Sequence, residues 1–438
     1  MKKVTYFGLL LAVALTGLSS CSSSDDVTSD PTNPKSGESR LTLTISTPVA
    51  KTASAKGGSF VMGSRATDIT TANKDVSVNV DRERTINRIT VGIFSQNGDT
   101  VRTIKEFVAR PKDKTASTGD GYFSDVTNSN DKTVDVITNT LKSKDTVVVA
   151  VNAPAGKFAG AATIAAFRAR TEGIDTVLAT KFGATSAEDS IVSNNIPMSG
   201  TAYLQPATTD GNFTATVPVY HQTAKVTLKS LSVDFKADGA YRDASFTLKN
   251  VYLINVPAAL NFSDSAYANP TKEFFVGLDP ENKKTGKVKN YLTSSEIKND
   301  SKEDITLSGY TGKEGANTSL GRVYTFYTMP NRDSTKTNRT KLIIYGTFKA
   351  NASDTGSDVY YPVPLNISYD DNGVENSTAP DGTNKPRGTV NPNKNYKCTV
   401  VIRSKGASSP DEDITPKQAT ITVKVQDFDN KDQTTVFN

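Results

Sequence analysis

The chain has 438 residues, of which 36% are hydrophobic and 22% are charged, and its formal net charge is +5. This length predicts about two domains, and the small net charge excludes an electrostatic nucleic-acid binder of this size. One histidine and two cysteines are too few for a clustered His/Cys zinc site, a four-cysteine iron–sulfur site or a disulfide framework. We therefore expect no metal, no other cofactor and no nucleic-acid partner.

The first twenty residues have the pattern of a bacterial export signal. Two lysines precede an apolar stretch at 7–18, which is too short and wrongly flanked for a transmembrane helix. Small residues then precede Cys21 in the order of a bacterial lipobox, whose cysteine thiol receives a diacylglycerol. We predict a signal peptide at 1–20, a covalent lipid on Cys21 and a flexible tether at 21–39, where Ser, Thr, Asp and Pro dominate.

From residue 40 onward, apolar and polar residues alternate, which is typical of β-strands. The alternation is clean at 41–45, and the continuous apolar run at 147–151 predicts a strand that is buried on both faces. Clusters of Gly, Asn, Asp and Pro separate the strands. Further strands are predicted at 76–80, 226–228, 248–256, 323–329, 342–348, 359–367, 396–402 and 419–425.

One segment, 157–170, has apolar residues at helical spacing. The fold class is therefore predicted to be all-β, with two β-sandwich domains and a short helix in the first. Two strand-like stretches follow each other without a turn signal near residue 222, so we place the boundary there, between domains at 40–222 and 223–438. His221 lies at this junction and is interpreted as an ordinary packed residue.

A search for catalytic residues finds no constellation. The K-T-G at 284–286 precedes the S-x-x-K at 295–298, which is the wrong order for a penicillin-binding enzyme. The aspartates at 427–432 lack the glycine and the glutamate of a calcium loop. Cys398 alternates with apolar neighbours, which favours a small buried hydrophobe. We expect a binding or structural protein, not an enzyme.

Several short stretches then occur in a characteristic order: 147–152, 196–200, 326–331, 342–346, 361–363, 395–397 and 419–428. In this order, and with the lipobox cysteine, the chain resembles the FimA-type major fimbrillins, the shaft subunits of type V pili in Bacteroidota. The resemblance implies two transthyretin-like (Ig-like) β-sandwich domains. It also implies a structural subunit of a surface fimbria that supports adhesion.

The resemblance further implies a maturation route. A lipoprotein precursor reaches the cell outer membrane, and an arginine-specific or trypsin-like protease cuts in the loop after the first strand. Arg65 and Ala66 best match the cut position, so the first strand at 40–46 and the loop at 47–65 would be lost from the mature extracellular fimbrium. The groove that opens would accept the C-terminal strand of another subunit. The implied partners are copies of the chain, minor fimbrial subunits, the protease, and host or bacterial surface ligands.

Two strands share a pattern that fits such an exchange independently of the family. Both 41–45 and 419–423 place apolar residues on one face and threonines on the other. A sheet that accepts the first strand could accept the second in the same register. The displaced strand is predicted to present Leu41, Leu43 and Ile45, and the donor strand Ala419, Ile421, Val423 and Val425.

Two alternatives stay open. One is a minor fimbrial subunit: an anchor should lack a cleavable arginine such as Arg65, and a tip should lack a donor strand such as 419–425. The other is a surface glycan-binding lipoprotein, which usually displays aromatic platforms, often tryptophan, whereas this chain has no tryptophan. The short polar end at 429–438 leaves the extent of the C-terminal arm open.

Overall fold

The computed structural model describes residues 38–47, 67–69, 83–109, 121–125, 131–179, 195–209, 211–262, 269–280, 287–294, 297–299, 303–370, 374–382, 386–414 and 418–428. The predicted lipid site Cys21, the cleavage residues Arg65 and Ala66, the strand at 76–80 and the tail at 429–438 lie outside these ranges. Within them, no helix is long and apolar enough to cross a membrane.

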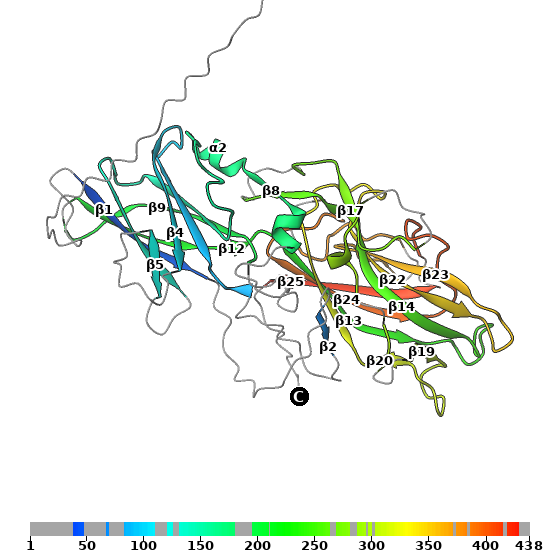
Figure 1. The fold of residues 1–438 in the computed structure, drawn as a ribbon. Helices are drawn as coiled ribbons and strands as arrows, with labels where there is room; N and C mark the ends of the chain where they lie inside the picture. The colour runs from blue at the N-terminus through cyan, green and yellow to red at the C-terminus, as the bar shows by residue number, and fades with distance from the viewer. Residues whose placement is uncertain are drawn as a thin grey trace, which may run out of the picture.

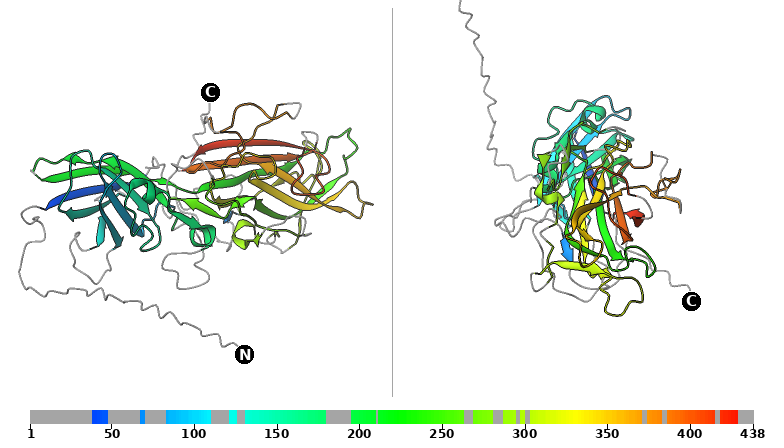
Figure 2. Two further views of the ribbon diagram at one scale, coloured as in Figure 1. Left: turned by 90° about the horizontal axis from the view of Figure 1, so that it is seen from above. Right: turned by 90° about the vertical axis from the view of Figure 1, so that its right-hand side faces the viewer.

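The described residues form two β-rich lobes side by side (Figure 1), and the left view in Figure 2 shows the same arrangement from above. Strands dominate both lobes, which confirms the predicted all-β class.

The first lobe is built on a 10-stranded sheet in the order β10-β11-β1-β6-β5-β4-β3-β7-β9-β12. The sheet folds over itself, because one apolar core joins the inner faces of β1, β6 and β11 to those of β3, β7 and β9. Its strands are β1 (Ser39–Ser46), β3 (Arg88–Phe94), β4 (Val101–Ala109), β5 (Tyr122–Asp125), β6 (Lys132–Thr138), β7 (Thr146–Val151), β9 (Met198–Tyr203), β10 (Gln205–Pro206), β11 (Asn212–Pro218) and β12 (Tyr220–His221).

The second lobe packs two sheets, in the orders β2-β21-β13-β24-β25 and β19-β14-β22-β23, with β20 paired to β13. A single core cluster joins their inner faces. The strands are β2 (Thr67–Ile69), β13 (Ala224–Val233), β14 (Ser245–Ile254), β19 (Ile305–Ser308), β20 (Ser319–Leu320), β21 (Val323–Thr328), β22 (Lys341–Lys349), β23 (Ser357–Pro364), β24 (Lys394–Ile402) and β25 (Ala419–Asp427).

Smaller elements lie between and around the lobes. They are α2 (Ile164–Arg168), the π-helix η1 (Asp175–Ala179), the 3₁₀ helix η4 (Asn290–Leu292), and the short strands β8 (Thr171–Gly173), β15 (Val256–Pro257), β16 (Ala259–Asn261), β17 (Phe274–Val276) and β18 (Lys287–Val288). The strands pair as β15-β17-β18 and β16-β8.

The helix is shorter than the predicted 157–170. Gly160 has φ +72°, which a right-handed helix cannot contain, so the chain turns there. The helix begins only after Thr163, whose hydroxyl accepts a hydrogen bond from the amide of Ala166. Phe167 on its buried face stacks on Phe158, with ring centroids 4.0 Å apart.

Some segments that precede residue 222 in the sequence pack on the second lobe. β8 pairs with β16, and Ile174, Val177 and Leu178 belong to the core of the second lobe. The strand β2 likewise pairs with β21 of that lobe. The chain leaves the sheet of the first lobe after β12 and enters a sheet of the second lobe at β13, near the boundary placed at residue 222. The earlier segments named above nevertheless pack on the second lobe. The division into folding units at 40–222 and 223–438 stays a prediction.

Gly200, which ends the 196–200 stretch, lies where β9 crosses β11. A Cβ at this position would lie 2.1 Å from the backbone oxygen of Pro218 and 2.8 Å from Cγ1 of Val217. Real Cβ atoms do not approach so closely, so only glycine allows the two strands to cross here.

Gly200→Ala is therefore expected to lower the free energy of unfolding by about 1–3 kcal/mol, because the strands must move apart. Equilibrium unfolding in denaturant measures this change. Gly321→Ala is the control, since a Cβ there has nothing within 4 Å. If the two substitutions lowered the free energy of unfolding equally, β9 and β11 would be able to move apart at the crossing without cost.

Candidate functional site

The predicted displaced strand lies inside the first sheet, between two neighbours. β1 pairs antiparallel with β6 and parallel with β11. Leu43 at its centre lies opposite Val134 on β6 and Ala215 on β11. Both backbone edges of β1 are therefore hydrogen-bonded, and its loss would leave two facing strand edges unpaired.

The inward face of β1 is completely buried. Leu41, Leu43 and Ile45 are each 0% exposed and belong to the core of the first lobe. Burying each such side chain contributes roughly 1.5–3 kcal/mol. The walls that they cover include Val134 and Val217, also fully buried, so the site under β1 is an apolar slot.

A polar contact holds the other face of β1. Asp135 on β6 accepts hydrogen bonds from Arg40 Nη2 at 2.7 Å and from Thr42 Oγ1 at 2.9 Å. The hydrogen bond to Asp135 raises the pKa of Arg40 above its ordinary value, so the guanidinium stays charged. The sequence analysis does not predict Asp135. The one feature that could have indicated it is an acidic residue on the polar face of an alternating strand.

The predicted donor strand lies at an edge of the second lobe. Among the described strands, β25 pairs with β24 and with no other. Ala419 and Val423 are buried in its own lobe, whereas Ile421 and Val425 are only partly covered. β1 and β25 thus belong to different sheets in different lobes, and one chain does not bring them together.

A buried charged cluster lies at the junction of the lobes, just past the end of β25. Glu83 is 1% exposed and forms an ion pair with Lys225, with Nζ 2.7 Å from Oε1. The hydroxyl of Tyr327 donates to the same carboxylate. Burial, followed by the nearby charge of Glu83, raises the pKa of Tyr327 well above its ordinary value, so the phenol keeps the proton that it donates.

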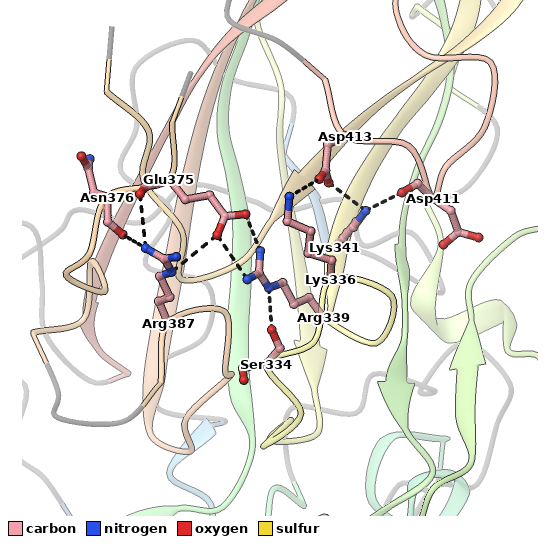
Figure 3. A network of polar contacts seen from close by, with 9 residues as sticks. All are labelled: Ser334, Lys336, Arg339, Lys341, Glu375, Asn376, Arg387, Asp411 and Asp413. Atoms are coloured by element: carbon pink, nitrogen blue, oxygen red, sulfur yellow. Dashed lines mark hydrogen bonds and ion pairs between the residues drawn. The ribbon is translucent and has the colours of Figure 1, made fainter. Parts of the chain in front are cut away.

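Other polar residues gather in loops of the second lobe, as Figure 3 shows. Glu375 accepts from Arg339 at 2.6 Å and lies 3.5 Å from Arg387, while Asp413 lies 3.4 Å from Lys341. Burial alone would raise the pKa of Glu375, but the hydrogen bonds and charge of Arg339 outweigh it and lower that pKa. Since these cations face acidic partners, we assign the network a structural role in joining loops.

The described residues offer neither a clustered metal site nor a reactive thiol. They contain no group of three or more His, Cys, Asp or Glu side chains that could hold a metal ion. Cys398 is buried, and burial raises the pKa of its thiol to about 12, so the reactive thiolate is disfavoured.

No protein-family model and no curated protein matches the chain. Solved structures do match. A "putative cell adhesion protein" from Bacteroides eggerthii is 18% identical over 89% of this chain and 96% of its own, with a TM-score of 0.52. Another from Parabacteroides distasonis is 15% identical over 89% of this chain and 99% of its own, with a TM-score of 0.50. A fimbrilin from Porphyromonas gingivalis is 15% identical over 91% and 100%, with a TM-score of 0.48.

At this level of identity, the likeness to the two adhesion-type structures shows the fold. The chain has the two-lobed β architecture of these Bacteroidota proteins along nearly their whole length. The all-β fold predicted from the sequence is therefore shared with these two adhesion-type structures.

Proposed function

We propose that the chain is a non-enzymatic structural subunit of a surface fimbria that supports adhesion. The precursor carries a lipid on Cys21 at the outer membrane, and a trypsin-like protease cuts between Arg65 and Ala66. The mature subunit then polymerises by donor-strand exchange into the extracellular fimbrium. Its partners are further copies, minor fimbrial subunits, the protease, and host or bacterial surface ligands.

One observation carries this proposal: the strand that processing would remove is an inner strand with a fully buried face. Removal of β1 uncovers the slot under Leu43 and frees the edges of both β6 and β11. Such a slot strongly favours the addition of another strand.

The C-terminal strand has the chemistry to fill this slot. If Ile421, Val423 and Val425 took the places of Leu41, Leu43 and Ile45, most of the lost apolar burial would be restored. In that register Thr422 would replace Thr42, so its hydroxyl could donate to Asp135 as Thr42 does.

Arg65→Ala is expected to prevent processing and to accumulate full-length lipoprotein without fimbriae. N-terminal sequencing of fimbriae sheared from cells that express the unchanged chain should begin at Ala66. Lys56→Ala is the matched control, because it removes a cation from the same loop and should leave processing intact. Fimbriae whose subunits still begin at Cys21 would overturn the strand-exchange mechanism.

The same experiment separates a shaft subunit from an anchor. A shaft subunit should be recovered in the sheared fraction as a ladder on unboiled gels. An anchor should keep its lipid and β1, and should stay with the cell envelope as a single uncleaved species.

A further inference from the structure

The residue that directly follows the edge strand β25 is buried at the junction of the lobes. Phe428 is 3% exposed, and its amide donates to the backbone oxygen of Asn393 at 2.9 Å. Its ring stacks on the ring of His221, with centroids 4.1 Å apart. Figure 1 shows β25 reaching this junction.

Three further side chains complete the surroundings of Phe428. Lys225 Nζ lies 4.5 Å from the centre of its ring, and the ring of Tyr327 lies nearly parallel to it at 6.0 Å. Behind them, Glu83 accepts from Lys225 and Tyr327 through its carboxylate, and its backbone oxygen accepts from His221 Nε2 at 2.9 Å. We call His221, Lys225, Tyr327 and Glu83 the junction box.

The box is selective for an aromatic ring. A buried ammonium over a ring face is attracted by the negative potential of that face, and an aliphatic side chain of equal size offers no such attraction. The two flat neighbours, His221 and Tyr327, also stack on a ring. The box thus holds Phe428 by more than apolar contact.

The box also joins segments that are distant in the sequence. Glu83 belongs to the chain between the predicted cleavage site and β3, His221 and Lys225 lie where one lobe passes into the other, and Tyr327 lies on β21. Phe428 cannot follow β25 into another subunit without leaving all of them.

We propose that the junction box is a latch: by holding Phe428, it retains the C-terminal strand in its own subunit and limits its release as a donor. This inference rests on the proposed donor role of β25. It assigns a regulatory task to a cluster that strand exchange itself does not need.

Hydrogen exchange of the unprocessed full-length chain tests the latch directly. Phe428→Ala is expected to accelerate exchange of the β25 amides on the order of tenfold or more, while β13 and β21 keep their protection, because only the edge strand opens. Phe428→Leu keeps apolar bulk without the ring and should give an intermediate increase.

Asp427→Ala is the matched control. It removes the neighbouring surface ion pair with Lys394, 2.6 Å long and 54% exposed at the aspartate, but leaves the box intact. It should change β25 exchange by less than about threefold, since exposed pairs stabilise little.

Polymerisation after processing supplies the second measurement. The Phe428→Ala chain should assemble faster than the unchanged chain at equal concentration. Unchanged exchange in β25, or an equal increase across the whole second lobe, would overturn the latch.

The latch and the proposed function fail separately. If substitutions in β25 block assembly but Phe428→Ala leaves β25 exchange unchanged, strand donation stands and the latch is wrong. If Phe428→Ala accelerates exchange in β25 but processed chains assemble normally without that strand, the junction box does retain β25 and the donor role is wrong.

Discussion

An Ile421→Asp chain is expected to be exported, folded and processed, yet to form no polymer. In its own lobe Ile421 is only partly buried on the edge strand β25, so an aspartate there can reach water. In the register proposed above, it would instead enter the slot of Leu41, which is 0% exposed. An unpaired carboxylate in that slot costs several kcal/mol, which is enough to block insertion.

Ile421 is a sharper probe than its neighbour Val423. Val423 is 7% exposed in its own lobe, so Val423→Asp would also damage the precursor. Lys424→Asp is the matched control, since Lys424 lies on the exposed face of β25 and would take the place of Thr44, which lies opposite Thr133 and Thr216 and away from Asp135. It should leave the polymer largely intact.

Unboiled gels of sheared material measure the polymer, and resistance to protease measures whether the remaining monomer is folded. Degradation of the Ile421→Asp monomer would mean that β25 is needed in its own core. Normal ladders from the same variant would move the donor role to another segment.

Glu83→Ala is expected to lower the free energy of unfolding by about 3–5 kcal/mol, because it leaves a buried ammonium without its partner. The side chains of Lys225 and Glu83 are 8% and 1% exposed, and their charged atoms are 2.7 Å apart. Removing both charges together, by Glu83→Gln with Lys225→Met, should recover most of the loss, since buried pairs are often replaceable by neutral groups.

Denaturant unfolding of the unchanged chain, Glu83→Gln, Lys225→Met and the double variant forms a double-mutant cycle for this pair. Asp304→Ala is the control, because it breaks an exposed pair with Lys298 and should cost less than about 1 kcal/mol. If Glu83→Ala were as mild as Asp304→Ala, the Glu83 carboxylate would have to be hydrated in solution.

The sequence predicts the inward face of β1 well, because strict alternation has one physical solution when a sheet covers a core. Leu41, Leu43 and Ile45 are all completely buried. Alternation does not, however, reveal the neighbours of a strand. The parallel pairing with β11 joins residues about 170 positions apart, and no local pattern encodes it.

The junction box shows the same limit more strongly. Glu83 and Lys225 are 142 residues apart, and each alone is indistinguishable in sequence from a solvated surface charge. His221 was interpreted as a packed residue, and it is 0% exposed, but its stacking on Phe428 depends on how the two lobes meet. The predicted helix is longer than the observed one for a local reason. The spacing of its alanines indicates a helix that continues across Gly160, whereas the positive φ of Gly160 prevents this.

The mixed pairing of β1 has a consequence for the shape of an assembly. Since one wall of the slot is parallel to β1 and the other antiparallel, the slot distinguishes the two directions of any strand that enters it. The slot lies in the first lobe and the arm in the second, so each contact joins unlike surfaces and repeats in one sense. Subunits joined in this way would form a fibre with two different ends, one presenting an empty slot and the other an unused arm. A chain truncated before β25 would therefore stop growth at one end and leave the other end active.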